Sequence, residues 1–275
     1  MNTLRVFPCK IYRPLARESI LMTSISLPLA PDGTLVGDYL SGTANPSFAV
    51  LWIHGFGSHR GGEKSEAVRD ECARRGWSFA AFDFRGHGAS SGTMHELRAS
   101  GLIEDLTVIR DWLKTVHGHT QLGLVGSSMG GFAAAWFAAR NPDAVVGSVL
   151  IAPSFGFLER RWERLTDAER EEWRRTDRLR VKNDWVETEL GYGFIEERDQ
   201  FRSVDLANTW KTPALLIHGA ADEVVPDSDS LGFFRQAAYP GIELCLFKAG
   251  DHRLTAYKDE IAAKVGLFFS RLIRV

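Results

Sequence analysis

The sequence predicts an α/β domain with a mostly parallel sheet that carries one insertion. From residue 48 onward, continuous apolar runs, typical of strands buried on both faces, alternate with segments of helical periodicity. The alternation stops at a charged, arginine-rich stretch, 157–210, and resumes after it. Because the same pattern flanks that stretch, we expect one core domain over 1–156 and 211–275 and a lid insertion over 157–210.

The strands and helices follow from local patterns. The first two strands are expected to form a hairpin, since a turn sequence from Pro28 to Asp32 separates them. Within the insertion, Thr166 and Glu169 form a capping box, which predicts a helix beginning near Thr166. In chain order, strands are expected at 20–26, 33–40, 48–53, 77–82, 122–125, 145–151, 213–217 and 242–247. Helices are expected at 63–75, 97–116, 132–140, 227–237 and 255–273.

Length, charge and cysteine content limit the class of protein. The 275 residues suit one large α/β domain, and a formal net charge of -2 gives no reason to expect nucleic acid or an anionic membrane as a partner. Cys9, Cys72 and Cys245 lie far apart without metal-type spacing, so free thiols in a reducing compartment are expected. Residues 1–15 lack the apolar centre of a signal peptide, and no apolar run is long enough to span a membrane. We therefore expect a cytoplasmic protein without stable membrane insertion, of undetermined oligomeric state.

The segment that organises the chain is Gly-x-Ser-x-Gly, with Ser128 at its centre. An apolar run enters it, and a run of small residues with helical character leaves it. A serine between a strand and a helix, with Gly126 and Gly130 two positions away on either side, is typical of a strained turn that exposes the hydroxyl at a helix N-terminus. Ser128 is therefore the candidate nucleophile.

A nucleophilic serine needs a base and a carboxylate that orients the base. Functional groups gather at the carboxyl ends of strands in a parallel sheet, and Asp222 and His252 follow two successive expected strands there. We therefore expect Ser128, Asp222 and His252 to be the catalytic residues. Glu223 is a rival to Asp222, whereas Asp251 is expected to turn away from the base or to cap a loop.

The other histidines are expected to have structural roles. His54 and His87 lie in glycine-rich loops at strand ends, where an imidazole commonly braces the loop, and His218 sits at the strand end before the acid. His117 and His119 flank a glycine at the end of a helix, without a carboxylate partner in view. The sequence therefore predicts no metal site and no cofactor.

Acyl transfer also needs donors where negative charge develops on the carbonyl oxygen. The N–H of Met129, at the start of the helix after Ser128, is one candidate. The loop after the strand at 48–53 is expected to supply the other from Phe56, because Gly55 and Gly57 allow its backbone to approach a substrate closely.

Five motifs in this order resemble the α/β-hydrolase superfamily, over residues 20–275. They are His-Gly-Phe-Gly at 54–57, Asp-Phe-Arg-Gly-His-Gly-Ala-Ser at 83–90, Gly-Ser-Ser-Met-Gly-Gly at 126–131, His-Gly-Ala-Ala-Asp-Glu-Val-Val-Pro at 218–226 and Gly-Asp-His at 250–252. The serine elbow and the Asp-His-Arg ending are most similar to the esterase and thioesterase branch that contains palmitoyl-protein thioesterase-type and acyl-glucuronide-cleaving enzymes. The resemblance implies an eight-stranded sheet with helices on both faces, a small helical lid after the sixth strand, and the triad of Ser128, Asp222 and His252. The expected oxyanion loop at 54–57 is His-Gly-Phe-Gly and departs from the His-Gly-Gly-Gly of many lipases. The size of the acyl group that the site accepts is therefore left open.

The expected function is hydrolysis of a small-molecule carboxylic ester or thioester of short to medium acyl chain, through an acyl-enzyme. Ser128 at the turn between strand and helix argues against enzymes of this fold that need a carboxylate nucleophile at that position. A prolyl-type aminopeptidase is an alternative, because lid carboxylates would bind the amine of its substrate. A non-catalytic binding protein is a further alternative from another class. The candidate lid carboxylates are Glu163, Glu171, Glu172 and Glu196.

The insertion is expected to form a helical lid over Ser128. Phe157, Leu158 and Trp162 fall at spacings that can share a helix face, so they are expected to line an apolar wall for the acyl chain. The alternative is that this stripe packs the lid onto the body. The arginines of the lid either form a solvated face or bind an anionic leaving group such as a coenzyme A phosphate; they are Arg160, Arg161, Arg164, Arg170, Arg174 and Arg175.

Overall fold

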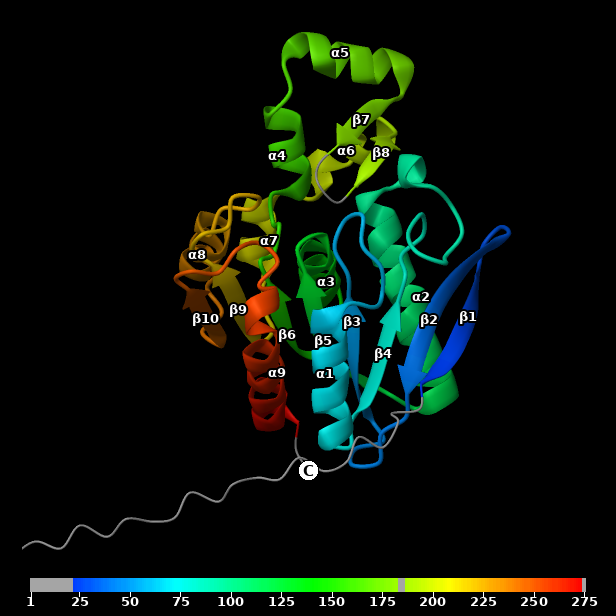
Figure 1. The fold of residues 1–275 in the computed structure, drawn as a ribbon, viewed down its shortest axis with the longest axis vertical. Coiled ribbons are helices and arrows are strands. Elements are labelled where there is room, and N and C mark those ends of the chain that lie inside the picture. Colours follow the sequence, from blue (N-terminus) through cyan, green and yellow to red (C-terminus); the bar gives the residue numbers. More distant parts are fainter. Residues whose placement is uncertain (1–21, 183–185, 274–275) are drawn as a thin grey trace, which may run out of the picture.

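The computed structural model describes residues 22–182 and 186–273, which build an eight-stranded sheet with helices on both faces (Figure 1). The strand order is β1-β2-β4-β3-β5-β6-β9-β10. β1 pairs antiparallel with β2, and β2 with β4, whereas the other neighbouring strands run parallel. The expected α/β class and mostly parallel sheet are confirmed. The strands are β1 (Thr23–Leu29), β2 (Gly33–Leu40), β3 (Phe48–Ile53), β4 (Ser78–Phe82), β5 (Gln121–Ser127), β6 (Val145–Ile151), β9 (Ala214–Gly219) and β10 (Ile242–Phe247).

Alternation of side chains along the strands divides the core into two layers. Phe48 and Val50 of β3 belong to the layer under α1 (Glu63–Arg74) and α9 (Lys258–Leu272), whereas Leu51 belongs to the opposite layer. All six residues of β3 are buried, as expected of a central strand covered on both faces. The opposite layer is covered by α2 (Ala99–His117), α3 (Met129–Arg140) and α8 (Ser228–Gln236).

Several boundaries differ from the expected ones by a few residues, and three of the differences are informative. The first strand begins at Thr23 instead of residue 20, and residues 20 and 21 lie outside the described part of the chain. The helix expected from residue 132 begins at Met129, because it starts directly at the turn that holds Ser128. The helix expected from residue 255 begins as a short 3₁₀ turn, Thr255–Tyr257, which continues into α9.

The insertion after β6 is mostly helical, as expected, and it also contains two short strands that the sequence did not predict. Its two short strands pair antiparallel, and the Arg180 and Glu187 side chains form an ion pair across them. The capping box is present, since Thr166 Oγ1 accepts a hydrogen bond from the Glu169 N–H at 3.3 Å. Figure 1 shows the lid above the carboxyl ends of the parallel strands, with α5 farthest from the sheet. Its elements are α4 (Phe157–Glu163), α5 (Asp167–Thr176), β7 (Leu179–Lys182), β8 (Glu187–Leu190), α6 (Gly193–Glu196) and α7 (Ser203–Thr209).

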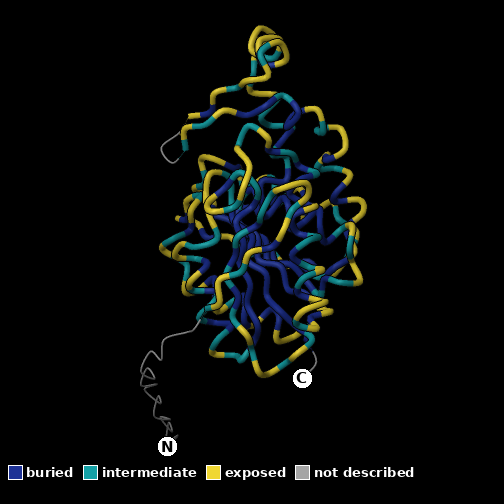
Figure 2. Tube along the Cα trace, turned by 90° about the vertical axis from the view of Figure 1, so that its right-hand side faces the viewer, coloured by how far each residue is buried: buried dark blue, intermediate teal, exposed yellow. Residues whose placement is uncertain are grey.

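Burial is concentrated in the sheet, whereas the outer side of the lid is exposed (Figure 2). Cys72 is buried and Cys245 is half-buried, both as free thiols, and burial raises the pKa of Cys72. Cys9 lies outside the described residues. None of the helices in the described ranges is long and apolar enough to cross a membrane.

Candidate active site

Ser128 lies at a sharp turn between β5 and α3. Its backbone φ is 58°, in the left-handed region that strains a residue with a side chain. Glycines make the turn possible: a Cβ on Gly126 would lie 2.3 Å from the Gly130 carbonyl oxygen, and one on Gly130 would lie 2.1 Å from that of Ile53. The turn therefore holds the serine at the N-terminus of α3, where the helix dipole favours negative charge.

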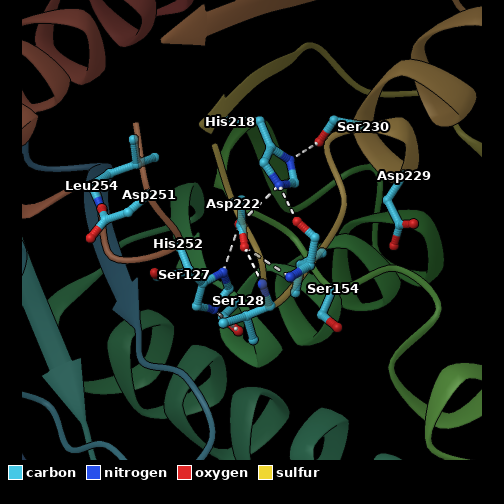
Figure 3. Close-up of polar contacts among 12 residues, drawn as sticks. Ser127, Ser128, Ser154, His218, Asp222, Asp229, Ser230, Asp251, His252 and Leu254 are labelled. Carbon is cyan, nitrogen blue, oxygen red and sulfur yellow. Dashed lines mark hydrogen bonds and ion pairs between the residues drawn. The ribbon is translucent and has the colours of Figure 1, made fainter. Parts of the chain in front are cut away.

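Loops at the carboxyl ends of three strands bring Ser128, His252 and Asp222 into one hydrogen-bonded chain (Figure 3). Ser128 Oγ is 3.0 Å from His252 Nε2, and His252 Nδ1 is 2.7 Å from Asp222 Oδ2. Because an ionised carboxylate only accepts, Nδ1 carries the proton, and Nε2 is left to accept from the Ser128 hydroxyl. This geometry is suited to removing the hydroxyl proton of Ser128.

The Asp222 side chain is fully buried and accepts four hydrogen bonds. Oδ2 accepts from His252 and His218, and Oδ1 accepts from the N–H groups of Val224 and Val225, both at 2.8 Å. Burial is the largest influence and acts to raise the pKa, but the hydrogen bonds from His218, His252 and the Val225 N–H outweigh it. They hold the pKa of Asp222 well below its usual range. Asp222 is therefore ionised at neutral pH and can stabilise a protonated His252.

His218 is the site residue whose contact with the acid the sequence did not predict. Its Nε2 lies 3.1 Å from the Val225 carbonyl, which only accepts, and 3.2 Å from Asp222 Oδ2. Nε2 therefore donates, and Nδ1 accepts from the Ser230 hydroxyl at 2.7 Å. The available signal was the position of His218 within β9, four residues before the acid.

Neither rival carboxylate contacts His252 within the part of the chain that the structure describes. Glu223 is exposed to solvent. Asp251 accepts a hydrogen bond from the Leu254 N–H at 2.8 Å, so it closes the turn after His252. The loop geometry therefore brings Asp222 to the base and directs its rivals elsewhere.

Two backbone N–H groups next to the serine, those of Met129 and Phe56, donate to no acceptor within the described residues. The loop that carries Phe56 packs against the elbow, since a Cβ on Gly55 would lie 3.2 Å from the Ser127 carbonyl oxygen and 3.3 Å from Ser128 Cβ. Two unpaired donors beside a nucleophile are the components of an oxyanion hole.

His54 and His87 lie behind that loop as neutral rings. The Nδ1–H of His54 donates to the Gly55 carbonyl at 2.8 Å, and its Nε2 accepts from the Phe84 N–H at 3.0 Å. Burial, followed by repulsion from His87, lowers the pKa of His54 to about 3, and burial also lowers that of His87. Neither ring touches Ser128 or Asp222.

His117 and His119 stack on each other at the end of α2, with ring centroids 5.9 Å apart. His119 donates through Nδ1 to the Pro46 carbonyl and accepts from the Tyr39 hydroxyl, both at 2.8 Å. Both ring nitrogens of His119 are thus used in holding the end of the helix. Across residues 22–182 and 186–273, there is no cluster of three histidine, cysteine or acidic side chains placed to hold a metal ion.

Ser128 opens into a cavity of about 560 Å³, a volume typical of a small-molecule site. Phe56 and Phe157 contribute to its wall with ring centroids 5.9 Å apart. Other lining residues include Trp52, Lys64, Ser154, Arg161, Arg164, Val224, Val225, His252 and Arg253.

Two of the three expected substrate-binding residues do not line this cavity. Leu158 is 1% exposed and packs in the core beneath α4. Trp162 lies between the guanidinium groups of Arg170 and Arg198, 4.9 and 4.7 Å from its ring centroid. Phe157 alone of the three reaches the cavity, because a helix of seven residues turns successive apolar side chains toward different neighbours.

Comparison with known proteins shows the family to which the chain is similar. The family model described as serine aminopeptidase, S33 (Hydrolase_4) matches residues 44–184, more than half of the chain. Palmitoyl-protein thioesterase ABHD10, mitochondrial, of Mus musculus is 30% identical over 219 residues, which cover 76% of this chain and 70% of that protein.

Solved structures share the fold over nearly the whole chain. A putative hydrolase from Agrobacterium vitis S4 superposes with a TM-score of 0.80 at 24% identity, covering 95% of this chain and 100% of its own. Est1E from Butyrivibrio proteoclasticus with ferulic acid bound superposes with a TM-score of 0.78 at 21% identity. The match covers 90% of this chain and 98% of the Est1E chain. The family model matches more than half of the chain, and the match to the thioesterase relative covers 76% of it. The chain therefore belongs to the serine aminopeptidase S33 family of α/β hydrolases, which has esterase and thioesterase relatives.

Proposed function

We propose that this protein is a serine hydrolase that cleaves carboxylic esters or thioesters. Ser128 Oγ attacks the acyl carbonyl while His252 Nε2 takes its proton, and the protonated ring then gives that proton to the departing alcohol or thiol. Water attacks the resulting acyl-enzyme with His252 again as the base, which releases the acid and restores Ser128. The observation that carries the proposal is the continuous hydrogen-bonded chain from Ser128 through His252 to the ionised Asp222.

In this mechanism the N–H groups of Phe56 and Met129 stabilise the oxyanion of each tetrahedral intermediate. Their unpaired state supports the assignment, as does the close approach of Gly55 to the elbow. Phe56, Phe157, Val224 and Val225 offer apolar contacts in a cavity of about 560 Å³, which favours short to medium acyl chains.

The name of the matched family supports an aminopeptidase as the second candidate. That activity would need carboxylates near Ser128 for the amine of the substrate. The expected groups lie elsewhere: Glu171 and Glu172 pair with arginines on the outer side of α5, Glu196 is exposed, and Glu163 lines a different cavity. Because these four candidate carboxylates lie away from Ser128, the ester hydrolase is favoured over the aminopeptidase.

The test compares wild type with Ser128→Ala on p-nitrophenyl acyl esters, acyl thioesters and aminoacyl p-nitroanilides. We expect cleavage of esters or thioesters by the wild type and a loss of several orders of magnitude in kcat in the variant, with unchanged thermal unfolding. Faster turnover of the anilides would favour the aminopeptidase. A fluorophosphonate probe that fails to label Ser128, together with no turnover, would favour a non-catalytic binding protein.

We further propose that 157–210 is a lid on a core domain of 1–156 and 211–275, and that the partner is a small molecule. A cytoplasmic location is proposed from the free cysteines, while the name of the mouse relative makes mitochondria the competing compartment. Fractionation of cells that express the full chain distinguishes the two locations.

A further inference from the structure

The cavity at Ser128 is lined by cations with few acids to balance them. Five lysine or arginine side chains reach it, whereas Glu63 is the single carboxylate among its lining residues. Glu63 itself lies 3.8 Å from the ammonium group of Lys258. The cavity therefore carries net positive charge next to the candidate nucleophile.

The lid arginines divide into those with acidic partners and two without. The guanidinium groups of Arg161 and Arg164 form no ion pair or hydrogen bond with another described residue, and both residues line the cavity. The remaining arginines of the lid each lie within 4.0 Å of a carboxylate: Arg160, Arg170, Arg174, Arg175, Arg178, Arg180, Arg198 and Arg202. The lid thus leaves unmatched the two guanidinium groups that face the cavity alongside Arg160.

Arg161 is the more strongly desolvated member of this pair. It is half-buried, and its pKa is lowered by burial first and by repulsion from Arg164 second. A guanidinium without a hydrogen-bonding partner in such a place is unfavourable until an anion binds to it. Two neighbouring guanidinium groups match a carboxylate or phosphate well, because each presents parallel N–H donors.

The cationic residues that line the cavity from outside the insertion also lack acidic partners in the described part of the chain. Lys64 donates a hydrogen bond to Ser127 Oγ at 3.0 Å, one residue from the nucleophile, and forms no ion pair within the described ranges. Burial, followed by repulsion from Arg253, lowers the pKa of Lys64 to about 8, although Asp251 and Asp222 act against this. Arg253 also lines the cavity and has no acidic partner among the described residues.

We propose that Arg161 and Arg164, with Lys64 and Arg253 from outside the insertion, form a subsite for an anionic group of the substrate. The inference rests on the proposed ester or thioester hydrolysis and narrows it to substrates that carry a carboxylate or phosphate besides the scissile bond. Either half of the substrate can supply that anion, so the test needs one arm for each.

The experiment measures a ratio of kcat/KM values, anionic over neutral, for matched substrates. One arm compares butyryl-coenzyme A with the butyryl thioester of N-acetylcysteamine, so the anion lies on the leaving group. The other compares mono-p-nitrophenyl glutarate with p-nitrophenyl pentanoate, so it lies on the acyl group. In at least one arm we expect the double variant Arg161→Gln/Arg164→Gln to lower the ratio by about 10- to 100-fold.

Arg175→Gln is the matched control, because Arg175 belongs to the same lid, pairs with Glu172 and lies away from the cavity. It is expected to leave the ratio unchanged, and the double lysine variant, which keeps both charges, is expected to restore most of it. Should the double glutamine variant fail to fold, the two single variants carry the test. A ratio that stays at the wild-type value in both arms overturns the subsite. If Ser128→Ala still abolishes cleavage of the neutral substrates in that case, the proposed hydrolase activity stands.

Discussion

Asp222 and Glu223 are neighbouring carboxylates with opposite environments. The backbone at Asp222 turns its side chain inward, where two histidines and two backbone N–H groups donate to it, while Glu223 points to solvent. Sequence reasoning favoured Asp222 because alternate residues of a loop that leaves a strand face opposite ways. The position of His218 four residues before the acid was the one available signal, and it did not by itself identify His218 as a second donor, since the chain must fold back before the ring meets the acid.

Replacing Asp222 by asparagine is expected to lower kcat by roughly 10³- to 10⁴-fold on an ester substrate. An amide has no charge to stabilise protonated His252, and it can hold the ring in the wrong tautomer. Glu223→Gln is the matched control and is expected to stay within about twofold of wild type. Steady-state kinetics on both variants decide the assignment, and similar losses in the two would contradict it.

At the scale of elements, the elbow depends on how closely α3 approaches β3. A Cβ on Gly130 would lie 2.1 Å from the Ile53 carbonyl oxygen and 2.5 Å from that of His54. Backbone atoms of a buried strand end cannot move aside at little cost, so the helix would have to shift and carry Ser128 with it.

Gly130→Ala is therefore expected to destabilise the fold by about 1–3 kcal/mol or more, as overpacking does, and to reduce activity beyond the loss of folded protein. Gly232→Ala provides the control, since Gly232 lies in α8 with no atom within 4 Å of an added Cβ. That change should be neutral or slightly stabilising, because alanine favours a helix. Chemical denaturation and specific activity of both variants test this. Equal stabilities would show that the close approach does not constrain the elbow.

In the lid, local sequence patterns did not predict every element or the direction of every side chain. Central strands such as β3 and β6 were predictable because each is a continuous apolar run that is buried along nearly its whole length. The hairpin of β7 and β8 is short and charged, and it depends on cross-strand pairs such as Arg180 with Glu187. Helical spacing predicted a face for Phe157 and Leu158, but it did not reveal which side of α4 the cavity occupies.

At the scale of the whole molecule, the insertion shares one of the two core layers with the body, but the Trp173 side chain contacts Leu190 and Tyr192 within the insertion itself. Trp173 is fully buried in the lid, and its Nε1–H donates to the Leu190 carbonyl at 3.0 Å. Contacts to the body include the hydrogen bond from the Gly191 N–H to the His95 carbonyl at 3.0 Å. The core layer on the other face of the sheet contains no described residue of 157–210, so the packing of that layer does not depend on Trp173.

Trp173→Ala is therefore expected to loosen the lid before the body unfolds. Removing a buried tryptophan costs about 3–5 kcal/mol, and the loss falls on the contact between α5 and β8, which the Trp173 side chain joins. Limited trypsin digestion should cleave within 157–210, where many arginines are exposed, much faster than in the wild type, while the sheet domain stays resistant. Trp162→Ala removes a half-buried ring of the same lid and should have a smaller effect.

Because the sheet positions Ser128, a fluorophosphonate probe should still label the loosened variant. If Trp173→Ala instead unfolds the entire chain in a single transition, the lid and the body form one cooperative unit.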